Sequence, residues 1–133
     1  MKPIKASMTK GLQHGSNIPT CDNSGGKIVK LISVKWSKTV KGKSPEAGVG
    51  DMIMCSIVSG KPEVRKKVFA AIIVRQKKEF RRLDGTRVKF EDNAVVVLKD
   101  EDGNPKGTMM KGAIPKEVVD RWPAVGKLGG VIV

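Results

Sequence analysis

Residues 68–74 read Val-Phe-Ala-Ala-Ile-Ile-Val and form the longest uninterrupted apolar run in the chain. The run contains branched and aromatic side chains, which favour extended backbone. Because both side-chain directions of an extended segment are apolar here, we expect a strand that is covered on both faces. Seven residues are far fewer than the roughly 20 that a membrane-spanning helix needs. The run therefore indicates the centre of a β fold, and no membrane partner is expected.

Short apolar segments bounded by turn residues lie on both sides of this run. Asn23-Ser24-Gly25-Gly26 separates one pair of segments, and Asp84-Gly85 separates another with a strong hairpin signal. In residues 87–90, Val88 and Phe90 alternate with cations, which predicts one face toward a core. No long helical pattern lies between the segments, so we predict a small closed barrel. The expected strands are Ile18–Asp22, Ile28–Trp36, Met52–Val58, Val68–Arg75, Phe80–Leu83, Arg87–Phe90 and Ala94–Lys99.

Helix signals occur only near the C-terminus. Pro115 suits a first helical position, and Pro123 ends that helix before a second short turn at residues 124–128. We expect the apolar residues 131–133 to pack back on the domain and residues 37–50 to form a long loop. The length of 133 residues fits one domain. We divide it into an N-terminal extension (1–13), a barrel with its ribbon (14–110) and a short helical segment (111–133).

The charge of the chain is large and unevenly distributed. Lys and Arg number 26 against 13 Asp and Glu, so the net charge is +13 at pH 7 and the pI is about 10.0. Residues 1–43 hold nine lysines against Asp22 alone, and residues 60–90 hold eleven cations against three acids. Residues 91–133 are nearly neutral, with six cations and seven acids. Two separate basic blocks in one small domain predict a polyanionic partner.

The basic blocks supply the candidate RNA-binding residues. Their cations suit phosphate groups, and arginine adds bidentate contacts. Aromatic residues are scarce, so recognition of folded RNA by shape and backbone is favoured over base stacking. The residues alone do not separate RNA from DNA. The candidates are Lys27, Lys35, Lys38, Lys41, Lys43, Arg65, Lys66, Lys67, Arg75, Lys77, Lys78, Arg81, Arg82, Arg87 and Lys89.

A search for catalytic or metal-binding chemistry finds no complete site. His14 is the only histidine and lies in a loop-like stretch, where an ordinary surface role is the simplest interpretation. Cys21 and Cys55 form no CxxC pair, so we expect reduced, buried thiols in a cytoplasmic protein. No apolar segment follows Met1, so no secretory signal is expected. The chain is predicted not to be an enzyme and to need no cofactor or metal.

Glycine-lysine pairs raise the question of a phosphate loop. In Gly42-Lys43-Ser44 the first P-loop glycine would fall on Ser37, and Pro45 follows where a helix should begin. Gly25-Gly26-Lys27 precedes a strand and not a helix, so it also fails as a P-loop. A backbone contact between this second turn and a phosphate stays open.

Several motifs in order resemble the universal large-subunit ribosomal protein fourteen family, in its archaeal and eukaryotic branch. The signature region runs from Ala71-Ile72-Ile73-Val74 through Asp84-Gly85 to Phe90, Asn93, Val96 and Val97. The stretch at residues 21–27 matches the family's Asp-Asn-Ser-Gly turn, with Gly26 replacing the usual alanine. Ala47-Gly48-Val49-Gly50-Asp51, Gly60-Lys61-Pro62-Glu63 and Trp122-Pro123 also match, and the resemblance covers residue 14 to the C-terminus.

The resemblance implies a mostly β fold: a five-stranded barrel with a β-ribbon hairpin extension and short C-terminal helices. It implies a structural constituent of the large ribosomal subunit that binds large-subunit rRNA and joins an intersubunit bridge to small-subunit rRNA. Implied protein partners are ribosomal proteins three and twenty-four, and the anti-association initiation factor six at the C-terminal region. A general nucleic-acid-binding or chaperone protein outside the ribosome is the alternative.

The C-terminal segment has two interpretations. It is either a protein-docking surface or a set of apolar residues that pack on the barrel, because an apolar stripe at helical spacing usually faces a core. The candidate protein-binding residues are Lys116, Val118, Asp120, Trp122 and Leu128.

Overall fold

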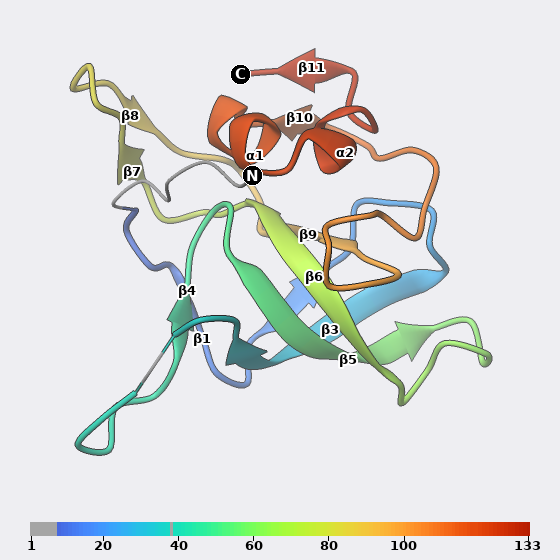
Figure 1. The fold of residues 1–133 in the computed structure, drawn as a ribbon. Helices are drawn as coiled ribbons and strands as arrows, with labels where there is room; N and C mark the ends of the chain where they lie inside the picture. The colour runs from blue at the N-terminus through green and yellow to red at the C-terminus, as the bar shows by residue number, and fades with distance from the viewer. Residues whose placement is uncertain (1–7, 38) are drawn as a thin grey trace.

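The computed structural model describes residues 8–37 and 39–133, and its centre is a five-stranded sheet (Figure 1). The strands follow the order β2-β3-β5-β6-β9, and each neighbouring pair is antiparallel. Every strand of the sheet falls on an expected strand, so the mostly β class is confirmed. The five strands are β2 (Asn17–Pro19), β3 (Gly26–Val34), β5 (Met52–Gly60), β6 (Val68–Arg75) and β9 (Ala94–Val97).

The two outer strands of this sheet approach each other. Directly after β2, Thr20 forms a parallel bridge with Val95 of β9, and the Cys21 N–H donates to the Val95 carbonyl at 3.1 Å. Within the described residues this contact is a bridge and not a paired strand. A five-stranded sheet is therefore confirmed, and its closure into the expected barrel stays a prediction.

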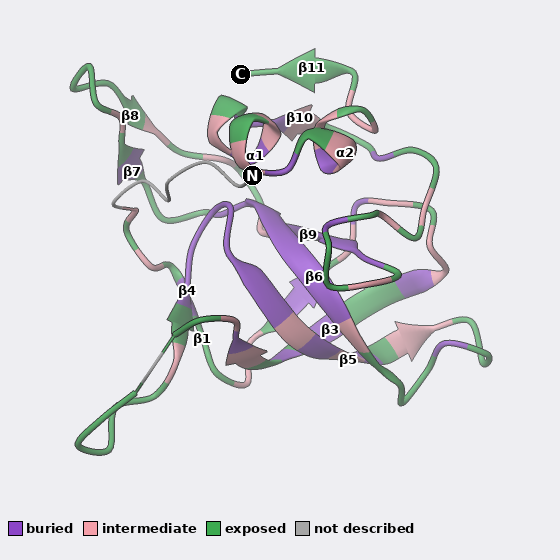
Figure 2. Cartoon of the chain, in the orientation of Figure 1, coloured by how far each residue is buried: buried purple, intermediate pink, exposed green. Residues whose placement is uncertain are grey.

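Strand β6 is buried on both faces, as its composition predicts (Figure 2). Ala71 and Ile73 point into one hydrophobic cluster, and Ala70, Ile72 and Val74 point into another. Successive residues of a strand face opposite sides, so one strand serves both clusters. The inner core comprises Leu12, Ile18, Val29, Leu31, Val34, Ala47, Ile53, Cys55, Ile57, Val64, Ala71, Ile73, Val95 and Val97. The outer core comprises Cys21, Val49, Met52, Ala70, Ile72, Val74, Phe80, Ala94, Val96, Leu98, Met110, Ile114, Val118, Trp122 and Val125.

The expected ribbon is present and extends away from the sheet (Figure 1). Strands β7 (Phe80–Arg81) and β8 (Arg87–Val88) pair in antiparallel register. In the turn between them Gly85 has φ +91°, a conformation that favours glycine, and the Asp84 carboxylate accepts the Thr86 N–H at 2.9 Å. The ribbon is shorter than expected, but its turn lies where Asp84-Gly85 places it.

The C-terminal segment folds over one end of the sheet (Figure 1). Helix α1 (Lys116–Arg121) follows Pro115, which is the N-cap and not the first helical residue. Trp122 ends α1 and caps α2 (Pro123–Gly126), so Pro123 both stops one helix and starts the next. Strands β10 (Ala113–Ile114) and β11 (Val131–Ile132) pair in parallel. The last residues therefore return to the fold through their backbone, although their side chains are exposed.

Strands β1 (Leu12–Gln13) and β4 (Glu46–Ala47), like β10 and β11, lie outside the expected set. Strand β1 pairs with β4. The region expected to be a long loop at residues 37–50 therefore returns to the body near its end, because Leu12 and Ala47 are buried in the inner core. No helix in residues 8–37 and 39–133 is long and apolar enough to cross a membrane.

Candidate nucleic-acid interface

Most of the predicted RNA-binding cations lie on the surface. The exposure of these cations follows from the strand alternation. In β8 and the residues after it, Val88 and Phe90 pack on the outer core, while the neighbouring cations are exposed. Lys38 lies outside the described residues. Among residues 8–37 and 39–133, only Arg87 of the exposed candidates forms an ion pair with an acid. The exposed candidates, together termed the cationic surface, are Lys27, Lys41, Lys43, Arg65, Lys66, Lys67, Lys77, Lys78, Arg81, Arg87 and Lys89.

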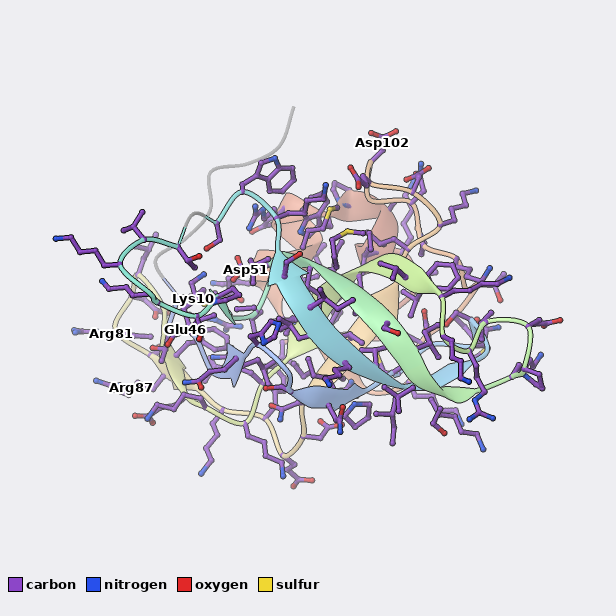
Figure 3. The ribbon with its side chains drawn as sticks, turned by 90° about the horizontal axis from the view of Figure 1, so that it is seen from below. Lys10, Glu46, Asp51, Arg81, Arg87 and Asp102 are labelled. Atoms are coloured by element: carbon purple, nitrogen blue, oxygen red, sulfur yellow. The ribbon has the colours of Figure 1, made fainter. Side chains whose placement is uncertain are left out.

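The ribbon presents two arginines side by side. Arg81 of β7 lies directly opposite Arg87 of β8 in the strand register, and both project from the same side of the molecule (Figure 3). Glu79 receives a hydrogen bond from Arg87 at 3.1 Å, which offsets only part of this charge. Like charges opposite each other destabilise a strand pair. An anionic partner that contacts both guanidinium groups would remove this repulsion.

The basic stretch 65–67 is presented on an anchored turn between β5 and β6. Val64 is buried in the inner core and fixes the position of the turn. The Lys66 N–H donates to the Ile57 carbonyl at 2.9 Å, and Lys66 has φ +63°. These contacts hold the backbone while Arg65, Lys66 and Lys67 remain exposed. The result is a rigid support for three flexible cations, which suits phosphate contacts.

Arg75 differs from the other candidates because it is buried. Its Nε and Nη2 donate to the two carboxylate oxygens of Asp92 at 3.0 and 3.2 Å. Its Nη1 donates to the carbonyls of Lys111 and Ala113 at 2.9 and 3.0 Å. These contacts tie the end of β6 to the segment before the C-terminal helices. The guanidinium is thus held inside the chain, and the predicted contact of Arg75 with RNA stays a prediction.

Arg82 and Lys35 are also engaged within the chain. Arg82 forms a bidentate pair with Glu117 of α1 at 2.6 and 3.3 Å and donates to the Val133 oxygen at 2.7 Å. Both partners of this pair are mostly buried, with 13% and 16% of the side chains exposed. Lys35 pairs with Glu101 at 2.9 Å. Arg82 therefore fastens the ribbon to the C-terminal segment and is not a free surface cation.

A buried polar network holds the C-terminal helices on the loop before β5. The Asp51 carboxylate is 2% exposed and accepts hydrogen bonds from Lys10 at 2.7 Å and from the Gly48 N–H at 2.8 Å. The Gly50 carbonyl accepts from the indole Nε1 of Trp122 at 2.9 Å and from Arg121 at 3.1 Å. The motif at residues 47–51 thus has a structural role that its sequence alone does not show.

The turn after β2 has a similar role. Asn23 donates to the Thr108 hydroxyl at 2.8 Å, and its side-chain oxygen accepts the Thr108 N–H at 2.8 Å. The Asp22 carboxylate accepts from the Ser24 hydroxyl at 2.8 Å and from the Val97 N–H at 3.0 Å. Burial raises the pKa of Asp22. This turn therefore ties the segment around Thr108 to the sheet.

The candidate docking residues divide into two groups. Val118 is fully buried and Trp122 is 3% exposed, so both belong to the outer core. Lys116 and Asp120 are exposed, and Leu128 is partly buried against the outer core. The packing interpretation is therefore correct for Val118 and Trp122, whose side chains do not form a surface.

The described structure brings together no cysteine–histidine pair or metal-binding cluster. The two thiols lie in different cores, and burial raises the pKa of both Cys21 and Cys55 to about 12. His14 is exposed between β1 and β2. In the part of the chain that the structure describes, no three His, Cys, Asp or Glu side chains gather closely enough to hold a metal ion.

The structure is a β body that carries exposed cations on anchored turns, which is the class of a small basic structural protein, and sequence comparison specifies the family. The family model described as ribosomal protein L14p/L23e matches residues 11–133. The chain is 50% identical to the large ribosomal subunit protein uL14 of Nanoarchaeum equitans, with 100% of both chains covered. It is 47% identical to the protein of the same name from Methanococcus vannielii, and the alignment covers 99% of each chain. It is 46% identical to that from Pyrobaculum aerophilum, and this alignment covers 98% of the present chain and 92% of the relative.

The chain therefore belongs to the ribosomal protein L14p/L23e family. It is a structural protein of the large ribosomal subunit, located in the cytoplasmic ribosome, and not an enzyme. The family match begins at residue 11, and the relatives also align across the first dozen residues, which the resemblance left out. This agrees with the structure, in which Lys10 and Leu12 contact the body.

Sequence reasoning did not include all the exposed cations. Lys30, Lys61, Lys106 and Lys111 are exposed as well. Lys30 could have been found from its position between two buried residues of β3, Val29 and Leu31. Lys111 carried no sequence signal, because its position depends on contacts with residues distant in the chain.

Proposed function

We propose that this chain stabilises the large subunit by binding large-subunit rRNA through its cationic surface. One observation carries the proposal: all but one of the exposed candidate cations lack an acidic partner among the described residues. Cations without acidic neighbours can replace the counterions of RNA phosphates, and the release of those counterions favours binding. Within the near-neutral residues 91–133, the C-terminal helices are then left for protein contacts.

Closure of the sheet into a barrel supports this role. The bridge between Thr20 and Val95 and the inner core shared by strands β2, β3, β5, β6 and β9 favour closure. A closed sheet presents its turns in one arrangement, which shape-based RNA recognition requires. The C-terminal segment shares the outer core with β6, so we also propose that the chain acts as one unit.

We further propose, on the family resemblance, a contact with small-subunit rRNA at an intersubunit bridge. Ribosomal proteins three and twenty-four and the anti-association initiation factor six are the proposed protein partners. The exposed residues Lys116 and Asp120, with the partly buried Leu128, form the proposed docking surface for factor six. Val118 and Trp122 act there only by holding the helices in place, because both are in the outer core.

Sedimentation after a high-salt wash tests the RNA-binding surface. The variant R81Q/R87Q removes the two opposed arginines of the ribbon, and K99Q/K127Q removes the same charge from exposed positions outside the cationic surface. We expect the ribbon variant to leave the large-subunit peak at a lower salt concentration than the control, because each lost phosphate contact weakens binding. Identical sedimentation profiles of the two variants would show that the ribbon arginines are not part of the RNA interface. Equal affinity of the wild-type chain for rRNA and unrelated duplex DNA would instead favour a general nucleic-acid-binding protein.

A further inference from the structure

An open pocket of about 330 Å³ lies beside the turn after β2. It is formed by strand ends and one segment that is distant in sequence, and its lining combines cations with small polar and apolar groups. A volume of this size suits a ligand larger than a single ion. The lining residues are Thr20, Cys21, Asp22, Gly26, Lys27, Arg75 and Lys111.

The backbone holds two lining lysines on opposite sides of the segment at residues 20–21. The Thr20 N–H donates to the Lys27 carbonyl at 2.9 Å, whereas the Lys111 N–H donates to the carbonyl of Cys21 at 2.7 Å. Lys27 and Lys111 therefore flank the same short segment, about two strand spacings or roughly 10 Å apart. Lysine side chains are long enough for both ammonium groups to reach one ligand between them.

Arg75 fixes one side of the pocket. Its Nη1 donates to the Lys111 carbonyl at 2.9 Å, so both the N–H and the carbonyl of Lys111 are held. Because Asp92 and two carbonyls hold the guanidinium, it cannot turn away from the lining. This side of the pocket is thus organised at its backbone before any ligand arrives, which lowers the entropic cost of binding.

The pocket has an excess of positive charge. Its lining holds Lys27, Lys111 and Arg75, and the charge of Arg75 is already paired with Asp92. The two lysines therefore face one lining carboxylate, that of Asp22, whose oxygens accept hydrogen bonds from Ser24 and Val97. Lys27 and Lys111 are exposed and form no ion pair with any residue in 8–37 and 39–133. Their ammonium groups are available for charge-assisted hydrogen bonds to an anion.

We propose that this pocket binds one nucleotide of rRNA, with its phosphate held between Lys27 and Lys111. The inference rests on the proposed RNA-binding function and names a site within it. A phosphate matches the two ammonium groups, and the remaining volume accommodates the attached ribose against the apolar part of the lining. The pocket thereby contributes a contact whose two lysines are held at their backbone by hydrogen bonds.

Binding to an archaeal large-subunit rRNA transcript tests the pocket. The variant K27Q/K111Q is compared with the wild-type chain and with K99Q/K127Q, which removes the same charge from exposed lysines outside the lining. Dissociation constants are measured over a range of salt concentrations. We expect an approximately tenfold loss for the pocket variant near physiological salt, with a salt slope reduced by about one, and a smaller loss for the control.

A titration with inorganic phosphate, followed by amide chemical shifts, gives an independent readout. We expect shifts at Thr20, Cys21, Lys27 and Lys111 in the wild-type chain and none in K27Q/K111Q. If the wild type selects rRNA but both variants lose the same affinity, the pocket proposal is overturned while the proposed function stands. If the wild type does not prefer rRNA to duplex DNA, the proposed function fails. If, in addition, phosphate causes no amide shifts in the wild-type chain, the pocket proposal is overturned as well. Phosphate shifts without rRNA selectivity support an anion pocket but overturn rRNA as the source of its ligand.

Discussion

Replacing Trp122 tests whether the C-terminal helices are fastened to the sheet through the outer core. Trp122 is 3% exposed and lies among the outer-core residues. A buried tryptophan removes roughly 200 Å² from water, which corresponds to an upper value of about 5 kcal/mol at 25 cal/mol per Å². We expect Trp122→Ala to lower the free energy of unfolding by about 3–5 kcal/mol.

A second variant separates packing from hydrogen bonding. The indole Nε1 donates to the Gly50 carbonyl at 2.9 Å, but Arg121 also donates to that carbonyl at 3.1 Å. Trp122→Phe therefore leaves the acceptor with a partner and retains most of the apolar contact. We expect a cost of about 1–2 kcal/mol. This variant remains informative if Trp122→Ala is too unstable to fold.

The measurement is urea unfolding followed by far-UV circular dichroism, with the slope of free energy against urea checked for constancy. Trp36→Ala is the matched control, because Trp36 is 63% exposed and stacks on Trp122 with ring centroids 6.4 Å apart. We expect it to cost less than about 1 kcal/mol. Equal effects of Trp122→Ala and Trp36→Ala would refute the assignment of Trp122 to the core.

Three further predictions concern buried polar groups and thiols. Gln76→Leu should cost about 2–4 kcal/mol in urea unfolding, because the fully buried amide bonds three backbone groups that would lose their partner; a change below about 0.5 kcal/mol would contradict this. Burial raises the pKa of Cys21 and Cys55 to about 12, so both stay protonated at pH 8, and an aromatic disulfide reagent should label them far more slowly in native than in urea-unfolded protein. Similar labelling rates would disprove the burial. A double-mutant cycle on Arg82 and Glu117 should give a coupling of about 1–3 kcal/mol, since both side chains are mostly buried; additive effects would argue against the bidentate pair.

The larger strands could be predicted from local pattern. In β6, apolar residues on both faces predicted two-sided burial, and the structure has a core on each side. In the ribbon, Asp84-Gly85 predicted the turn. Such segments carry enough side chains for periodicity to show, and turn residues mark their ends.

The two-residue strands could not be predicted in this way. Strands β1 and β4 pair residues that are more than thirty positions apart in the sequence, such as Leu12 and Ala47. A segment of two residues has no periodicity, and its pairing depends on where the larger sheet places its ends. The same holds for β10 and β11, which pair although both helices lie between them in the sequence.

The candidate interface was predictable in part. Alternation correctly predicted that Arg87 and Lys89 face outward. It did not predict that Arg75 and Arg82 are held inside the chain, because their carboxylate partners Asp92 and Glu117 are 17 and 35 residues away. Their ion pairs exist only once the sheet and helices have brought these residues together.

The sequence by itself determined the class of this protein: the segregated charge of +13, the β periodicity and the ordered motifs led to a family of ribosomal proteins. Only the tertiary structure decided which cations face solvent, that Trp122 belongs to the outer core, and that Lys27 and Lys111 share one pocket. The physical reason is that charge and periodicity are local properties of a chain. Burial and ion pairing depend on contacts between distant segments, which exist only after the chain has folded.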